Sequence, residues 1–195
     1  SVFCICFSLS SIKIPNSVVS FGFNSFFYCE ALTEIEIPSS ISSIRNGLLS
    51  KCFSLKTVKI PQSVTTIENN AFMDCTSLEN IIIPPSVKQI HSSVFQGCKS
   101  LKSIVIPATV TYVGDSLLLG CTSLTDVKFL APITRIGVCT FMECTSLKTI
   151  EIPESVTFIG YNSFYKCKSL SCVVVHSHID FKNTGIKPNV KVKLI

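Results

Sequence analysis

Residues 52–74 read CFSLKTVKIPQSVTTIENNAFMD, and this 23-residue unit recurs along most of the chain. Each unit begins with a cysteine, and we number the positions of a unit, its columns, from that residue. The eight units start, without a slip in spacing, at Cys6, Cys29, Cys52, Cys75, Cys98, Cys121, Cys144 and Cys167. A fixed period of this length indicates a repeat protein, in which units unable to fold alone bury a continuous core by stacking.

The apolar columns of the unit predict its first structural element. Column four is always leucine, columns seven and nine are almost always isoleucine or valine, and column ten is proline in six units. The alternation at seven and nine predicts a short strand with one face turned inward. Because equivalent strands recur at a fixed long spacing, they must pair in parallel, and the proline then ends each strand by removing a ladder donor.

The second half of the unit must return over the other side of the coil. Its apolar residues lie three and four positions apart, which fits a helical turn, whereas its Thr and Val content favours extended chain. We expect a short strand within 64–67 and one irregular helical turn near Ala71 and Phe72, with Phe72 filling the interior. The predicted fold is an α/β-type or mainly β solenoid. It is curved, with a parallel sheet on the concave side and short strands or helical turns on the convex side.

The consensus Cys-x-Ser-Leu-x-x-Ile-x-Ile-Pro-x-Ser-Val-x-x-Ile, with Phe ahead of the next Cys, resembles the BspA-like class of leucine-rich repeats, here with 23-residue repeats over residues 6 to about 179. The resemblance implies a right-handed solenoid, a role in protein binding or adhesion, often at a cell surface, and no catalytic residues. The sixth unit departs from the pattern, because Leu130 replaces the proline and Pro132 follows two positions later, so we expect a locally reshaped coil there. In the eighth unit His176 stands in the proline column.

The chain is expected to form one domain. We assign residues 1–195 to a single solenoid and residues 180–195 to a C-terminal capping strand, since Lys191 and Lys193 alternate there with apolar residues, as in a protected edge strand. No apolar run reaches the length of a membrane helix, and the first residues show no signal-peptide pattern. We expect a monomer.

The cysteine column allows several interpretations. Zinc sites collect ligands at short spacings, whereas these cysteines recur once per coil, so small buried thiols are favoured over a metal site, and disulfides between coils are the lesser alternative. Cys4, Cys139 and Cys172 lie outside the column and are better candidates for exposed thiols. Cys172, His176 and His178 share one side of a terminal strand, which makes them a disfavoured alternative zinc site.

The sequence favours no enzymatic chemistry. Ser and Thr mostly occupy repeated turn columns, the aspartates sit in unrelated columns with no His to complete a triad, and a glycine-rich phosphate loop is missing. A net charge of +5, from 17 basic and 12 acidic residues spread along the chain, gives no dedicated nucleic-acid surface. We therefore expect a non-enzymatic protein with no cofactor, no metal and no nucleic-acid partner.

The variable strand columns are the expected site of function, because solenoids usually bind through the concave face from which these columns project. Column eight alternates in charge at first, which also stabilises neighbouring strands, and then becomes apolar at Ile82 and Val105. We interpret this spot as the centre of a partner-binding surface, and ordinary strand-forming residues without a partner are the alternative. The candidate surface consists of Lys59, Asn80, Ile82, Ser103, Val105 and Lys128.

The preferred function is a protein-binding or adhesion module whose partner is a protein or a host or matrix-type ligand. An intracellular scaffold or regulatory adaptor with the same fold is the alternative. Free cysteines and the lack of Asn-x-Ser/Thr sequons favour a reducing cytoplasm, whereas the resemblance favours the cell surface. A sugar-binding module is disfavoured, because acids and aromatics do not cluster in matching columns.

Overall fold

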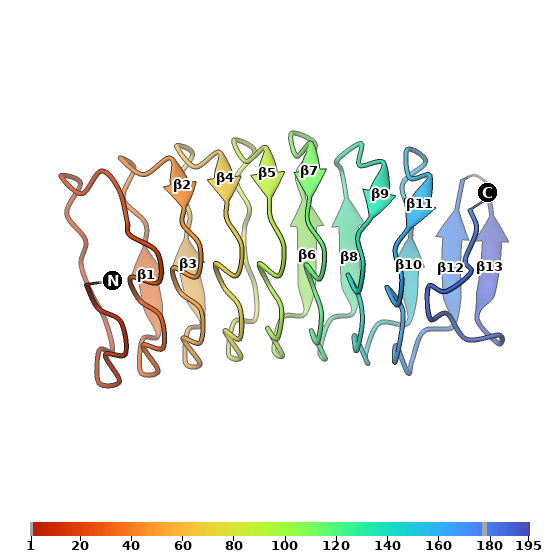
Figure 1. The fold of residues 1–195 in the computed structure, drawn as a ribbon, viewed down its shortest axis with the longest axis horizontal. Helices are drawn as coiled ribbons and strands as arrows, with labels where there is room; N and C mark the ends of the chain where they lie inside the picture. The colour runs from red at the N-terminus through yellow and green to blue at the C-terminus, as the bar shows by residue number, and fades with distance from the viewer. Residues whose placement is uncertain (1, 177–178) are drawn as a thin grey trace.

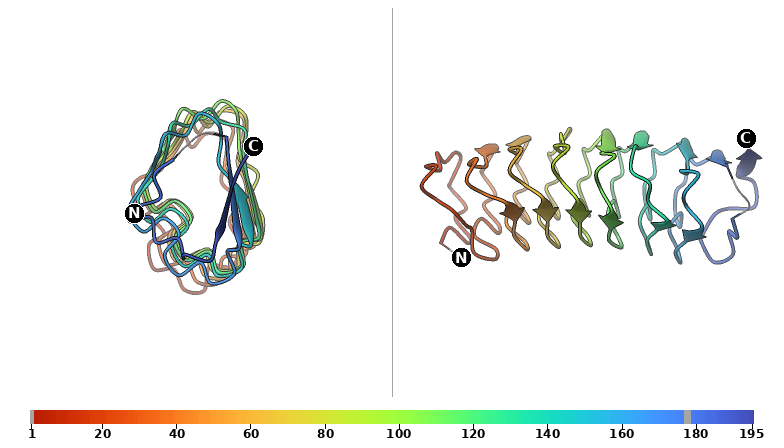
Figure 2. Two further views of the ribbon diagram at one scale, coloured as in Figure 1. Left: turned by 90° about the vertical axis from the view of Figure 1, so that its right-hand side faces the viewer. Right: turned by 90° about the horizontal axis from the view of Figure 1, so that it is seen from above.

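The computed structural model describes residues 2–176 and 179–195 as a parallel-strand β-solenoid (Figure 1). Each 23-residue unit makes one coil, and we number the coils 1 to 8 from the unit that starts at Cys6. Seen end-on and from above, the coils superimpose in outline and lie side by side in a single row (Figure 2). The described residues form strands and turns but no helix, so the predicted repeat solenoid is confirmed in its mainly β form.

The long strands lie at columns six to nine, on one side of the coils. Pairs β1–β3, β6–β8 and β10–β12 are parallel and keep the register of the repeat, so that Ile35 lies opposite Val58. Strand β13 then joins β12 in parallel, with Cys172 opposite Lys191. These strands are β1 (Glu34–Glu36), β3 (Thr57–Lys59), β6 (Ser103–Ile106), β8 (Asp126–Phe129), β10 (Thr149–Glu151), β12 (Cys172–Val175) and β13 (Lys191–Leu194).

The ladder of long strands is interrupted twice. Residues 80–83 of coil 4 form no strand, so β3 and β6 belong to separate sheets. A second break separates β8 from β10, beside Leu130 and Pro132, where the repeat is irregular. The expected reshaping of coil 6 is therefore confirmed, whereas the break at coil 4 was not predicted.

The short strands line the other side of the coils. Strands β2, β4, β5 and β7 form one parallel sheet, and β9 and β11 form another. The predicted strand within 64–67 is confirmed by β4. The short strands are β2 (Ser43–Ile44), β4 (Thr66–Ile67), β5 (Gln89–Ile90), β7 (Tyr112–Val113), β9 (Arg135–Ile136) and β11 (Phe158–Ile159).

The expected helical turn near Ala71 and Phe72 is wrong. Asn70 and Asp74, on either side of it, have φ values of 57° and 58°, a left-handed conformation that a right-handed helix cannot contain. The backbone N–H of Phe72 donates to the carbonyl oxygen of Val94 in the next coil at 3.0 Å instead of to its own segment. The segment is therefore a pair of turns tied to its neighbouring coil.

Two left-handed positions recur in columns nineteen and twenty-three. Short polar residues or glycine occupy many of these positions, which fits their lower cost in this conformation. The non-glycine members are Asn24, Asn70, Ser93, Ser116, Cys139 and Asn162 in column nineteen, and Ile5, Tyr28, Lys51, Asp74, Glu143 and Lys166 in column twenty-three. This conformation is a property of the repeat and sets where each coil turns toward the next strand.

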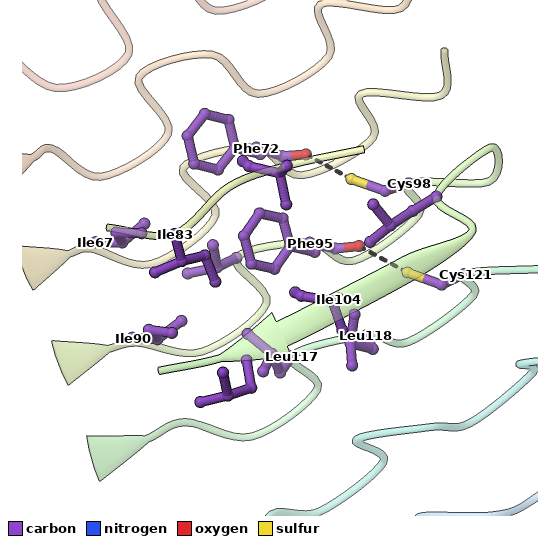
Figure 3. Packing of buried hydrophobic residues seen from close by; sticks show 14 of the residues in the cluster. Ile67, Phe72, Ile83, Ile90, Phe95, Cys98, Ile104, Leu117, Leu118 and Cys121 are labelled. Carbon is purple, nitrogen blue, oxygen red and sulfur yellow. Dashed lines mark hydrogen bonds between the residues drawn. The ribbon is translucent and has the colours of Figure 1, made fainter. Parts of the chain in front are cut away.

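The core runs through the middle of the coils as stacked layers of apolar side chains (Figure 3). Phe72 and Phe95 stack with their ring centroids 5.5 Å apart and their planes within 3°. Both rings are fully buried, as are the leucines of column four from Leu32 to Leu147. The predicted burial of Phe72 is confirmed, and the interior is filled with side chains along the row of coils.

Besides the stacked rings, a hydrogen bond made by the cysteines of column one recurs from coil to coil. The thiol of Cys98 donates a hydrogen bond to the carbonyl oxygen of Phe72 at 3.2 Å, and that of Cys121 donates to Phe95 at the same distance (Figure 3). Each of these thiols thus bonds the carbonyl group of the column-twenty-one residue that lies 26 positions earlier in the chain. The same bond is made by Cys29, Cys52, Cys75, Cys144 and Cys167.

Candidate functional site

Four residues of the candidate surface project outward from long strands. Lys59 is the last residue of β3, Ser103 and Val105 belong to β6, and Lys128 belongs to β8. Val105 lies opposite Lys128 in the register of β6 and β8. Ser103 is half-buried and the other three are exposed. We call the outward side chains of columns six and eight the long-strand face.

The other two candidate residues, Asn80 and Ile82, lie in the segment of coil 4 that forms no strand. Both are exposed. Ile82 is 83% exposed, the highest value for a large hydrophobic side chain in the described part of the chain, while Ile81 and Ile83 beside it are buried. Val105, in the next coil, is 43% exposed. Together Ile82 and Val105 form the apolar centre of the long-strand face.

An open groove lies on the N-terminal side of this centre, over coils 1 to 3. Its volume is about 670 Å³, and charged residues of both signs line it: Lys13, Glu34, Glu36 and Lys59. The proline column contributes one wall of the groove. Only Lys59 belongs to the candidate surface predicted from sequence, so sequence reasoning missed most of this groove, although its charged residues occupy the same variable columns.

A second, smaller groove lies on the C-terminal side of the centre. It has a volume of about 370 Å³ and lies over coils 6 and 7, with Asp126, Lys128 and Glu151 among its lining residues. The long-strand face is therefore an apolar centre flanked by two charged grooves. Lys59 and Lys128 are the candidate residues that line them.

Ion pairs join neighbouring coils on this surface and beside it. The Lys59 Nζ lies 3.3 Å from Glu36 Oε2, which confirms the attraction expected from the alternating column, and Lys102 Nζ lies 2.7 Å from Glu79 Oε2. The hydrogen bond from Lys102 and its charge lower the pKa of the Glu79 carboxyl. Exposed pairs of this kind hold side chains weakly, so these lysines are able to exchange their partners for a ligand.

The thiols of the cysteine column have the properties of buried structural groups and not those of reactive ones. Burial raises the pKa of the Cys52 thiol to about 12 and that of Cys167 to about 11, and it raises the pKa of Cys98 further. A reactive cysteine needs the opposite shift, because the thiolate is the nucleophile. All eleven cysteines are free, and Cys6, the first of the column, is only half-buried, as are those outside the column, Cys4, Cys139 and Cys172.

The alternative zinc site is only partly described. His176 Nε2 lies 3.0 Å from Glu151 Oε1, so this imidazole already has a carboxylate partner. Cys172 is half-buried in β12, and His178 lies outside the described residues. Within residues 2–176 and 179–195 the structure brings together no group of three His, Cys, Asp or Glu side chains able to hold a metal.

The serine and threonine columns serve the backbone. The hydroxyl of Ser63 donates to the Ile41 carbonyl oxygen at 2.6 Å, and that of Ser86 donates to Val64 at 2.7 Å. These hydrogen bonds link one coil to the one before it and satisfy carbonyl groups at the turns. The hydroxyls are therefore structural, in agreement with their predicted place in turn columns.

No helix in the described part of the chain is long and apolar enough to cross a membrane.

Comparison with solved structures identifies bacterial relatives. A leucine-rich-repeat protein of T. pallidum is 26% identical, with a TM-score of 0.72 over 78% of this chain and 72% of that one. One from Bacteroides ovatus is 24% identical, with a TM-score of 0.55 over 95% and 66%. A leucine rich cell surface protein of Faecalibacterium prausnitzii is 26% identical, with a TM-score of 0.52 over 86% and 62%. The chain spans less than two thirds of the length of the last two.

No curated protein is significantly similar to the chain. The family model of the BspA type leucine rich repeat region matches residues 1–125 and 119–185, in six copies. These matches cover nearly all of the eight cysteine-led coils and agree with the parallel solenoid that they build. The chain belongs to the BspA-type leucine-rich-repeat family.

Proposed function

We propose that this chain is a protein-binding module that acts through its long-strand face and carries out no catalysis. The observation that carries the proposal is the exposure of Ile82, at 83%, beside Val105, between two charged grooves. Apolar side chains surrounded by polar and charged ones are typical of the centre of a protein interface. Leucine-rich-repeat coils are in general interaction modules, which supports the same assignment.

Adhesion at a cell surface is the more specific form of the proposal. It is supported by the relative from Faecalibacterium prausnitzii, which is described as a leucine rich cell surface protein. An intracellular scaffold or adaptor is the second candidate, and the eleven free cysteines favour it, because thiols persist in reducing compartments. Labelling intact cells with a reagent that cannot cross membranes separates the two, since only a surface protein is labelled.

The binding face is tested by differential capture. The wild-type chain and a double variant, Ile82→Glu with Val105→Glu, are each used to capture proteins from the source cells and from a candidate host extract. We expect the partners bound by wild type to be lost by the double variant, because two carboxylates then replace the apolar centre. Circular dichroism and the melting temperature establish that the variant folds.

The matched control carries the same change on the opposite side of the coils. Tyr112 and Phe158 are 46% and 53% exposed on short strands β7 and β11. The variant Tyr112→Glu with Phe158→Glu is expected to capture the same partners as wild type. Capture that survives the Ile82 and Val105 changes and is lost in this control would overturn the proposal.

A further inference from the structure

We propose that the long-strand face binds an acidic protein segment in which apolar residues lie between two carboxylates. This inference rests on the proposed function and adds the chemistry of the partner. The apolar centre at Ile82 and Val105 needs apolar side chains opposite it, and the lysines around this centre need carboxylates.

The charges around the apolar centre are predominantly positive. In coils 3 to 6, columns six and eight and the adjacent column five, which lies beside the face, carry four lysines against two carboxylates: Lys56, Lys59, Lys102 and Lys128 against Glu79 and Asp126. One of these carboxylates, Glu79, is already held by Lys102. In coils 1 and 2 the balance reverses, with Lys13 against Glu34 and Glu36, and in coil 7 Glu151 of the C-terminal groove offsets Lys148. The centre of the face therefore favours a ligand of the opposite charge, and the N-terminal coils do not.

Two of the lysines are placed to receive the ends of such a segment. Lys59 lines the groove on one side of the apolar centre, and Lys128 lines the groove on the other. Lys59 is engaged only by the exposed carboxylate of Glu36, and no salt bridge of Lys128 is found within the described residues. Both ammonium groups are therefore available to a partner without breaking a buried contact.

The spacing of the coils gives the length of the segment. Lys59 and Lys128 are three coils apart in the same column, which is roughly 14 Å at about 4.8 Å per coil, the spacing set by the parallel pairs β4–β5, β5–β7 and β6–β8 that join these coils. An extended chain covers this span in about four residues at about 3.3 Å each. The geometry thus fits two acidic residues about four positions apart, with apolar residues between them over Ile82 and Val105.

A selection from a library of random displayed decapeptides tests the inference. The immobilised wild-type chain is the bait, and the enriched sequences are then measured individually by fluorescence anisotropy. We expect enrichment of Asp or Glu on both sides of Leu, Ile, Val or Phe at this spacing. Affinity is expected to fall as salt rises, because the flanking contacts are exposed ion pairs.

Two double lysine variants test whether Lys59 and Lys128 bind the acidic residues of the peptide. Lys59→Gln with Lys128→Gln is expected to weaken an enriched acidic peptide about fivefold to tenfold, the effect of losing two exposed charge pairs. The control, Lys88→Gln with Lys168→Gln, removes two exposed lysines away from this face and leaves the affinity unchanged. Both variants have the same net charge. An equal loss of affinity in the two variants would therefore reflect general electrostatics and would overturn the inference.

The outcomes separate the inference from the proposed function. Enriched peptides that lack acidic residues but are lost with Ile82→Glu and Val105→Glu overturn the acidic partner and leave the binding face standing. Peptides that bind equally to that double variant, or a selection that enriches nothing, also overturn the inference. In that case the differential capture above decides the proposed function on its own.

Discussion

The thiol of Cys98 lies 3.2 Å from the carbonyl oxygen of Phe72, 26 residues earlier, and donates a hydrogen bond to it. The same carbonyl also accepts the N–H of Cys75, so one acceptor in coil 3 closes the turn into coil 4 and also bonds the first residue of coil 5. Because the bond recurs with each buried cysteine of the column, the cysteines act as both fillers and links of the wall. Packing of the solenoid therefore accounts for the repeated cysteines, and a reactive role for their thiols is not needed to explain them.

Thiol reactivity follows from this burial. Seven cysteines are buried and four are half-buried: Cys4, Cys6, Cys139 and Cys172. We expect a thiol reagent at pH 8 to modify no more than these four quickly in the native protein, and all eleven after unfolding. Mass spectrometry of the labelled protein gives both numbers. Fast labelling of Cys75 or Cys98 in the folded chain would contradict the wall that we describe.

The buried thiols also predict a loss of stability in alkali. Burial raises the pKa of Cys52 from 9.0 to about 12 in the folded chain, so the folded state keeps a proton that the unfolded state loses. The resulting stability is fully present below pH 9 and disappears as the pH rises toward 12. We expect the melting temperature to fall between pH 9 and 10.5, and to fall less when Cys52 and Cys98 are both alanine. An equal fall in the two proteins would assign the effect to other groups.

The stacked phenylalanines are expected to contribute strongly to the stability of the core. Phe72 is fully buried against Phe95, so Phe72→Ala is expected to lower the free energy of unfolding by about 3 to 5 kcal/mol through lost apolar contacts and a cavity. Urea denaturation measures this change. The control is Phe158→Ala, whose side chain is 53% exposed and whose loss is expected to have a much smaller effect. Equal losses in the two variants would show that the Phe72 ring is not specially buried.

At the left-handed turn positions, substitutions to valine and to glycine are expected to have different effects on stability. Ser93 has a φ of 57°, which disfavours residues with a branched Cβ and favours glycine. We expect Ser93→Val to destabilise the fold by about 1 to 2 kcal/mol and Ser93→Gly to be neutral or slightly stabilising. Thermal unfolding of the pair tests this. A valine variant as stable as the glycine variant would contradict the assigned backbone conformation.

The repeat made much of the fold predictable. The leucine and isoleucine columns indicated strands, parallel pairing and an inward face, and Leu55, Val58 and Ile67 are buried accordingly. The turn at Asn70 and Asp74 was misjudged, because apolar residues three and four apart fit either a helix or turns with left-handed residues. Spacing alone does not show that the hydrogen bonds go to the next coil.

The exposure of the candidate residues was predicted from the sequence, whereas the shape of the surface around them was not. Columns six and eight named Ile82, Val105, Lys59 and Lys128 as outward residues, and the structure places them so. The break of the ladder at coil 4 and the two grooves were missed. They depend on how backbones of neighbouring coils approach one another, and the identity of a residue in a column does not specify this. Cys6 likewise shows that a column does not specify burial, because it occupies the cysteine column but is only half-buried.

The most direct test of the long-strand face as the binding surface is site-specific photo-crosslinking. A benzoylphenylalanine is placed at Val105 in β6 or at Tyr112 in β7, and each protein is irradiated in the extract from which wild type captures its partner. Our account predicts a covalent adduct with the partner from position 105 and none from position 112. An adduct from position 112 alone, in a protein that still captures the partner, would contradict it.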